Sequence, residues 1–225
     1  MSELFSIQLQ NRQQQGRDGV WLDLPTTTEQ VQAALRQIGI SSDNPQGLFI
    51  SGYFAEEEKR FAIPYNMVLA SNVDELNFLA SRLETLSAGE RAELNAALQA
   101  PQSELFSIGR ITDFPENVDY YVHLPDVHGP AQLGDYYLNR SGMVDMPDEW
   151  KGGIDTAQFG RYVAQQEQGA FTQYGYLVKS GDEWQKVHEG QPVPEEYRVL
   201  SFPASEILRD AANIPPPVQP ETEPQ

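Results

Sequence analysis

The chain has 225 residues and carries 33 Asp and Glu against 15 Lys and Arg, which gives a formal net charge of −18 at pH 7. The acidic residues are spread along the chain without an acidic tail, and 10% of all residues are aromatic, which argues against an acidic disordered segment. A folded surface this negative repels nucleic acid and lipid headgroups and attracts basic grooves.

The chain contains no Cys, which excludes disulfides, thiolate zinc sites and a Cys nucleophile. Residues 1–11 lack the basic and apolar regions of a signal peptide, and no apolar run approaches the ~20 residues that span a bilayer. We therefore expect a cytoplasmic protein. The length suggests one to three domains, and an apolar content of 40% favours several small cores over one large core.

Residues 1–62 predict a small ββαβ unit. Strands are expected at residues 4–9, 20–24 and 48–53, where apolar residues alternate or run together between turns. Between the last two strands, residues 26–29 form a helix N-cap region, and the apolar residues that follow have helical spacing up to Gly39.

Residues 63–110 predict a helical module. Asn72 is expected to cap one helix, and Ser87 a second helix that ends at Pro101. Ser103 is expected to begin a third, short helix. The regularly spaced Leu and Ala residues of this region are interpreted as core.

Residues 111–212 predict a mixed α+β module, with a short strand at 120–124 and a helix at 131–139 that stops near Gly142. A second helix is expected from Asp155, its N-cap, to Gln168.

Three side chains of that second helix are expected to face inward: Phe159, Tyr162 and Val163. A hairpin is expected to join residues 171–178 to 184–187 through a turn at 180–182, and residues 198–202 are expected to add a strand. Five Pro residues after residue 213 predict a disordered tail at 213–225. The predicted fold class is therefore α+β, with three small domains at 1–62, 63–110 and 111–212.

His123, Asp126 and His128 lie close enough in the sequence to suggest a metal site. However, Pro125 and the Gly-Pro pair at 129–130 mark this stretch as a loop, so a polar surface loop is the preferred interpretation, and no metal or cofactor is predicted. The P-loop, GxGxxG, GxSxG and HExxH motifs of common enzymes do not occur.

Adjacent carboxylates at residues 148–149 and 195–196 leave a carboxylate-pair hydrolase as an alternative function. Basic residues are scattered singly apart from residues 59–60, so direct binding to nucleic acid is not expected. Duplex DNA carries one charge per ~1.7 Å, so the 33 carboxylates would match the charge of roughly 55 Å of duplex. Composition alone does not single out such DNA-like behaviour, because many soluble proteins are acidic.

The segment at residues 133–138, Leu-Gly-Asp-Tyr-Tyr-Leu, is followed by Ser141 and Gly142 and resembles the antirestriction motif of the ArdA family. Residues 154–161 are similar to the family's Ile-Asp-x-x-x-Tyr/Phe-Gly-Arg segment, and residues 169–176 to its closing Gly-x-Phe and Gly-Tyr pieces.

Nearer the N-terminus, residues 19–23 resemble the family's Gly-x-Trp-Ile/Leu-Asp/Glu strand. Residues 49–53 resemble its Ile-x-Asp-Tyr piece, with Gly52 in place of Asp. The similar segments occur in the family's order and cover about residues 4–178, and residues 179–225 extend past the typical family end.

The resemblance implies an elongated, curved, three-domain homodimer that mimics bent B-form DNA. Such a protein would block type I restriction-modification enzymes by occupying their DNA-binding groove, without catalysis of its own, and would protect an incoming mobile element. The alternatives are the hydrolase above and an acidic adaptor that binds another basic protein.

Two sets of site residues follow from this interpretation. Leu133, Gly134, Tyr136, Tyr137 and Leu138 are assigned first to packing or to the dimer interface, and second to contacts with the target. The candidate phosphate-mimicking carboxylates are Asp113, Glu116, Asp119, Asp126, Asp135, Asp145, Asp148, Glu149 and Asp155.

Overall fold

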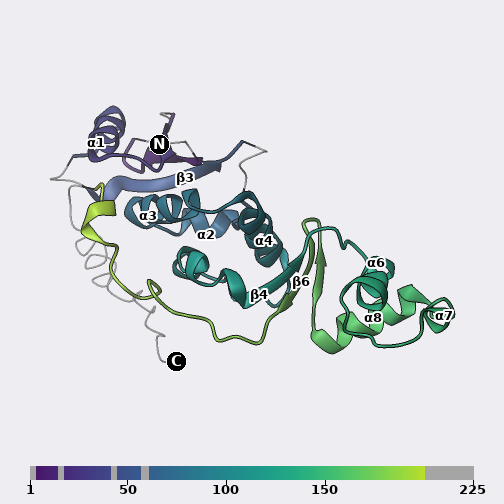
Figure 1. Cartoon of the computed structure of the whole chain (residues 1–225). Helices are drawn as coiled ribbons and strands as arrows, with labels where there is room; N and C mark the ends of the chain where they lie inside the picture. Colours follow the sequence, from purple (N-terminus) through teal and green to yellow (C-terminus); the bar gives the residue numbers. More distant parts are fainter. Residues whose placement is uncertain (1–3, 15–17, 42–44, 57–60, 201–225) are drawn as a thin grey trace, which may run out of the picture.

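The structure of the chain is a computed structural model, which describes residues 4–14, 18–41, 45–56 and 61–200. The described chain is elongated (Figure 1). Residues 5–54 form one end and residues 130–167 the other, with helices and a second sheet between them. The predicted α+β class is confirmed at this level, since the described chain is a mixture of helices and two small antiparallel sheets.

The first sheet follows the predicted ββαβ order. It consists of β1 (Phe5–Asn11), β2 (Val20–Leu24) and β3 (Leu48–Phe54), in the spatial order β2-β1-β3, and both pairings are antiparallel. Alternate residues of β1 are buried from Phe5 to Asn11, which gives the sheet one apolar face. The helix α1 (Thr28–Gln37) begins with a capping box between Thr27 and Gln30.

The helical region contains α2 (Tyr65–Leu69), α3 (Val73–Glu84), α4 (Ala88–Gln99) and α5 (Ile108–Thr112). The predicted N-caps Asn72 and Ser87 are confirmed, and each forms a capping box with the Glu three residues later. The prediction that a helix begins at Ser103 is wrong. α5 begins at Ile108, five residues after Ser103, because the hydroxyl of its N-cap Ser107 accepts the backbone N–H of Arg110. The five-residue α2 is too short to show a helical period in the sequence.

The rest of the described chain contains the strands β4 (Tyr121–Leu124), β5 (Ala170–Thr172) and β6 (Gly175–Lys179) and the helices α6 (Pro130–Asp135), α7 (Asp148–Lys151) and α8 (Thr156–Glu167). A π-helix, η5 (Tyr136–Arg140), follows α6. The described residues also form four short 3₁₀ turns: η1 (Pro45–Gly47), η3 (Phe114–Glu116), η4 (Val118–Tyr120) and η6 (Glu195–Tyr197). The second sheet has the antiparallel order β4-β6-β5. Asp155 caps α8 as predicted, through a hydrogen bond to the N–H of Gln158.

The predicted hairpin is wrong in its second strand. The turn lies between β5 and β6, where Gly175 has φ +118° and packs its backbone against the Leu124 carbonyl. Residues 184–187 form no strand, because the N–H groups of Gln185 and Val187 bond to the side chains of Asn117 and Asp113.

The prediction of a strand at 198–202 is also wrong for residues 198–200, which are the part of it that the structure describes. The N–H groups of Val199 and Leu200 both donate to a carboxylate oxygen of Asp74 on α3, at 2.8 and 2.9 Å, so they are not available to a strand ladder. Residues 201 and 202, and the tail predicted at 213–225, lie outside the described residues.

Tyr162 does not face inward, since 61% of its surface is exposed. Gly160 presents the face of α8 that packs on α6, and a residue two positions further along a helix is rotated by roughly 200° to the opposite side. Phe159 and Val163 are half-buried.

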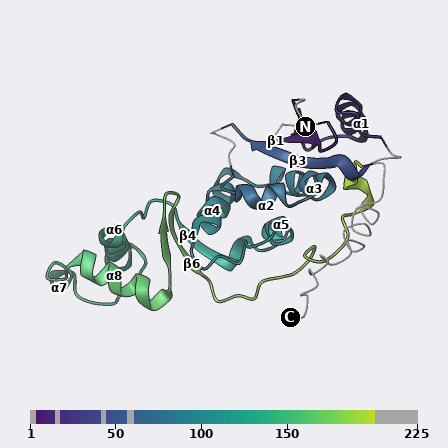
Figure 2. The ribbon, with the colours of Figure 1, turned by 180° about the vertical axis from the view of Figure 1, so that it is seen from behind.

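Most buried apolar residues belong to one cluster that runs from Leu4 in front of β1 to Leu200, through α1, α3, α4, α5 and β4. Both views place α2, α3 and α4 between the first sheet and α5 (Figures 1 and 2). A second, smaller cluster contains Val127, Leu133 and Tyr176 and lies toward the far end. The described parts of residues 1–62 and 63–110 therefore share one core, which also includes residues between 111 and 121 and at 177, 199 and 200. The division into three domains stays a prediction.

Residues 180–200, which we call the return segment, run back from β6 to α3 (Figure 1). Side chains at the two ends of η3 and on α3 hold it at both ends: Asn117 and Asp113 near its start, and Asn77 and Asp74 near its finish. In the part of the chain that the structure describes, no helix combines the length and apolar character needed to cross a membrane.

Candidate functional site

Exposed carboxylates extend along the molecule from the first sheet to the α7 end. Of the predicted phosphate-mimicking residues, Glu116, Asp119, Asp126, Asp145, Asp148, Glu149 and Asp155 are exposed, and Asp135 is half-buried. Further exposed carboxylates that the sequence analysis did not single out are Asp18, Asp23, Glu29, Glu56, Asp182, Glu183, Glu195 and Glu196. The acidic surface therefore includes the first sheet and the return segment as well as the predicted region.

The assignment of Asp113 as a phosphate mimic is wrong. Its side chain is 0% exposed, and it accepts the backbone N–H groups of Val187, His188 and Glu189 at 3.3, 2.6 and 3.2 Å. A carboxylate that is buried and shared by three donors presents no charge to a partner. Asp113 is an anchor for the return segment, and no local sequence pattern indicates donors more than 70 residues away.

Several exposed carboxylates already have partners within the chain. Glu116 pairs with Arg82, Asp135 with Arg140 at 3.1 Å, and Asp148 with Lys151 at 2.9 Å. The hydrogen bond and the charge of Lys151 lower the pKa of Asp148. Each of these pairs remains at the surface, where a cationic partner can compete for the carboxylate.

Four other exposed carboxylates are unpaired. Asp119, Asp126, Asp145 and Glu149 form no ion pair with any residue of the described chain. Their charge faces solvent without an internal counter-ion, so these positions are the clearest candidates for contact with a basic surface.

The motif at residues 133–138 lies where α6 crosses α8. Leu133 and Leu138 are 0% and 2% exposed. A Cβ on Gly134 would overlap the Thr156 carbonyl oxygen, and a Cβ on Gly160 would overlap the Pro130 carbonyl oxygen. The two helices therefore touch backbone to backbone, and each glycine is required by this close approach.

The tyrosines of the motif join the same cluster. The half-buried Tyr136 and Tyr137 have ring centroids 5.4 Å apart in an edge-to-face arrangement. The Tyr137 hydroxyl donates to Glu167 Oε1 at 2.5 Å, and the Tyr176 hydroxyl donates to Glu167 Oε2 at 3.0 Å. Burial, together with these bonds to a carboxylate, raises the pKa of both tyrosines.

Glu167 thus ties the motif to α8 and β6. These contacts support a packing role for Tyr137, while its predicted dimer and target contacts stay predictions. Nothing local in the sequence marks Glu167 as the partner of a tyrosine 30 residues earlier, so the sequence does not predict this contact.

The possible metal ligands do not converge. No group of His, Asp or Glu side chains able to hold a metal ion occurs among the described residues. His123 Nε2 lies 2.7 Å from the Tyr174 carbonyl oxygen, while Asp126 and His128 are exposed.

One carboxyl group is strongly perturbed. Burial, followed by the nearby charges of Glu90 and Asp119, raises the pKa of Glu93 to about 8, and Glu93 Oε1 is buried without a hydrogen-bond partner. A raised pKa in a cavity would favour the hydrolase alternative. However, Glu93 lines neither the cavity between α3 and α5 nor the one between α4 and α8.

The acidic, elongated chain with its motif at the α6–α8 crossing can be compared with known families. The family model described as "Antirestriction protein (ArdA)" matches residues 15–178. The chain belongs to the ArdA family, which confirms the resemblance seen in the sequence, and its function is antirestriction. The ArdA family is not a known enzyme family. No curated protein matches the chain.

Proposed function

We propose that the chain mimics B-form DNA and inhibits type I restriction-modification enzymes by occupying their basic DNA-binding groove. The observation that carries this proposal is the spread of exposed carboxylates along a molecule of the ArdA family. The described chain of this molecule is elongated (Figure 1). The mimic acts by binding alone and protects an incoming mobile element.

The physical basis is charge complementarity. Carboxylates take the places of phosphates and form charge-assisted hydrogen bonds with the Lys and Arg side chains of the groove. A net charge of −18 also speeds the encounter with a positive groove by electrostatic steering. No single carboxylate is essential in this scheme, because the charge is distributed.

A homodimer is part of the proposal. Two copies would lengthen the acidic surface beyond that of one chain, whose 33 carboxylates match the charge of roughly 55 Å of duplex and whose net charge of −18 matches roughly 30 Å. The exposed part of the motif region, where Tyr136 and Tyr137 are only half-buried, is the proposed place of contact.

Competition for the groove tests the proposal. A type I methyltransferase core with bound, labelled DNA is titrated with this protein, and we expect the DNA to be displaced. A variant with four neutralised carboxylates should displace it roughly 10- to 100-fold less well, at up to ~1 kcal/mol per lost charge. Its changes are Asp119→Asn, Asp126→Asn, Asp145→Asn and Glu149→Gln.

The matched control changes four exposed, uncharged side chains: Gln37→Asn, Gln99→Asn, Gln166→Asn and Gln173→Asn. It should displace DNA as well as the unchanged protein. A ternary complex that retains its DNA would contradict the mimic and favour the adaptor. Loss of all inhibition through one carboxylate, with the fold intact, would favour the hydrolase.

A further inference from the structure

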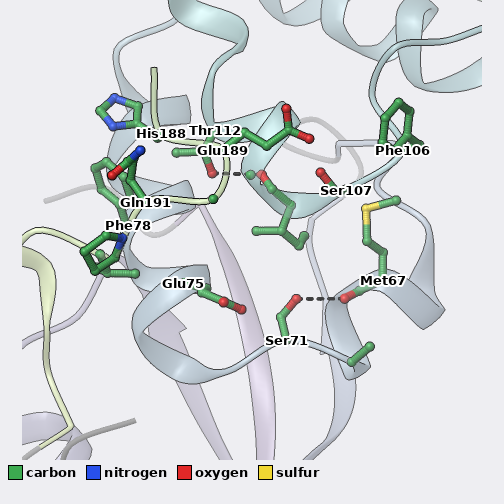
Figure 3. Close-up of a pocket in the computed structure, with 16 residues that line it drawn as sticks. Met67, Ser71, Glu75, Phe78, Phe106, Ser107, Thr112, His188, Glu189 and Gln191 are labelled. Carbon is green, nitrogen blue, oxygen red and sulfur yellow. Dashed lines mark hydrogen bonds between the residues drawn. The ribbon is translucent and has the colours of Figure 1, made fainter. Parts of the chain in front are cut away.

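A cavity of about 670 Å³ lies between α2, α3, α5 and the return segment (Figure 3). One wall is made by residues 188–193 of the return segment, which lie outside the region 15–178 matched by the family model. Asp113 holds this wall in place through the N–H groups of His188 and Glu189. The cavity therefore depends on a segment that the antirestriction motif does not include.

The lining combines apolar side chains with carboxylates. Phe78 and His188 lie on one side of the cavity and Phe106 and Met67 on the other, with Glu75 on α3 between them (Figure 3). Neither Lys nor Arg is among the described residues that line it. An apolar cavity with negative groups at its wall suits a ligand that has an apolar stem and a cationic head.

Two carboxylates of the lining, Glu75 and Glu189, differ in how far they can accept further hydrogen bonds. Glu75 is half-buried and uses Oε2 for a single 3.3 Å bond from the Asn72 N–H. Glu189 accepts from Arg110 Nε through Oε1, whereas its buried Oε2 has no hydrogen-bond partner and lies 3.5 Å from Lys186 Nζ. A carboxylate offers about four lone-pair sites, so Glu75 can accept further donors, whereas Glu189 contributes negative charge to the cavity wall.

Phe106 is suited to a planar cation. The residue is 63% exposed, and the Arg110 guanidinium already lies 4.4 Å from the ring centroid. The ring therefore borders both the cavity and the solvent. Its contact with Arg110 is a cation–π interaction with a guanidinium, the kind of contact that a ligand guanidinium would also make.

We propose that this cavity binds an arginine side chain of the protein partner. The guanidinium would bond to Glu75 and stack on Phe106, with the negative charge of Glu189 nearby, and the aliphatic stem would lie against Met67. Arginine fits better than lysine because its planar fork bonds to carboxylates in a bidentate manner and stacks on aromatic rings. This inference rests on the proposed function for the identity of the partner, whose basic groove supplies the arginine.

Methionine methyl NMR tests the binding directly. The chain has four Met residues, of which Met67 lines the cavity and Met143 and Met146 lie near α7 at the far end. With ¹³C-methyl-labelled Met, N-acetyl-arginine amide should shift the Met67 signal in a saturable way and leave Met143 and Met146 unchanged. The neutral comparator N-acetyl-citrulline amide should bind at least ~3-fold more weakly, because it lacks the charge.

Two variants probe the lining. Phe106→Ala and Glu75→Gln should each weaken the arginine amide ~3- to 10-fold, and Gln at position 75 can still complete the capping box with Asn72. The matched controls are Phe54→Ala, where 56% of the ring is exposed on the first sheet, and Glu29→Gln on α1. Both controls should bind the arginine amide normally. An unchanged Met67 signal, equal binding of citrulline, or equal effects of the controls would overturn the proposal.

The DNA-displacement assay separates this inference from the proposed function. We expect Phe106→Ala to inhibit ~3- to 10-fold less well than Phe54→Ala. If both displace DNA equally, the cavity does not take an arginine of this enzyme and the inference fails, while the proposed function stands. If the unchanged protein displaces no DNA, the proposed function fails, and the NMR titration still decides whether the cavity binds a guanidinium.

Discussion

Glu93 on α4 is a carboxyl group that folding removes from most of its hydration. Its pKa rises to about 8, from 4.5, so the folded chain binds a proton more tightly than the unfolded chain does. For this group, the unfolded state therefore loses its proton first as the pH rises. The contribution of Glu93 to stability is complete below pH ~4.5 and is lost as the pH increases through 8.

We predict that Glu93→Gln flattens this pH dependence. At pH 9 the variant should be about 1–2 kcal/mol more stable than the unchanged chain, a value reduced because the side chain is partly solvated. At pH 5 the two should be nearly equal. Urea unfolding at several pH values measures the difference, and Glu29→Gln on the exposed side of α1 serves as control. A stability difference independent of pH would show that Glu93 is ionised in the folded chain.

Gly134 makes a second prediction at the scale of one residue. A methyl group here has no room, because it would overlap the Thr156 carbonyl at the α6–α8 crossing. Gly134→Ala should therefore destabilise the chain by about 2–4 kcal/mol. Gly89→Ala on α4 is the matched control, since nothing lies within 4 Å of its added Cβ and the change favours the helix by up to ~1 kcal/mol. Thermal melting distinguishes the two, and equal melting temperatures would contradict the close crossing.

At the scale of elements, the return segment is held by buried carboxylates and amides. Asp113 accepts three N–H groups of this segment, and Asp74 accepts two more near its end. These bonds replace the strand ladder that an extended segment would otherwise form. They also position the wall of the proposed arginine cavity.

We predict that Asp113→Asn costs about 2–3 kcal/mol of stability, because the amide NH₂ turns a donor toward N–H groups that need an acceptor. Hydrogen exchange should accelerate at residues 187–189, and N-acetyl-arginine amide should bind more weakly. Asp126 is exposed and makes no ion pair among the described residues, so Asp126→Asn should leave the stability, the hydrogen exchange at residues 187–189 and the binding of the arginine amide unchanged. Unaltered exchange at residues 187–189 would mean that Asp113 does not fix the segment.

At the scale of the whole molecule, binding by distributed charge has a characteristic salt dependence. Raising the salt from ~0.05 to ~0.5 M shortens the Debye length to below ~5 Å. We predict that affinity for a type I enzyme then falls by orders of magnitude, while single changes such as Asp119→Asn each cost at most about 1 kcal/mol. Fluorescence anisotropy at several salt concentrations measures both. A flat salt response would indicate an apolar interface instead.

The sequence by itself determined what depends on composition and on neighbours a few residues apart. The net negative charge follows from the residue count, and the N-caps at Asn72, Ser87 and Asp155 follow from bonds that reach three residues along the chain. The ββαβ order and the family motif were predicted for the same reason, since turns, periodicity and motif spacing are local properties.

The tertiary structure alone decided which polar groups are buried and which elements meet. The sequence predicts a surface carboxylate at Asp113, whereas in the fold it bonds to residues 74–76 positions further on. The backbone contact of Gly134 with α8, the bond between Tyr137 and Glu167, and the cavity beside the return segment likewise join segments 22 or more residues apart. Such contacts depend on how helices cross and how the return segment folds back, because burial and long-range pairing are set by the packed chain as a whole and leave no local periodicity.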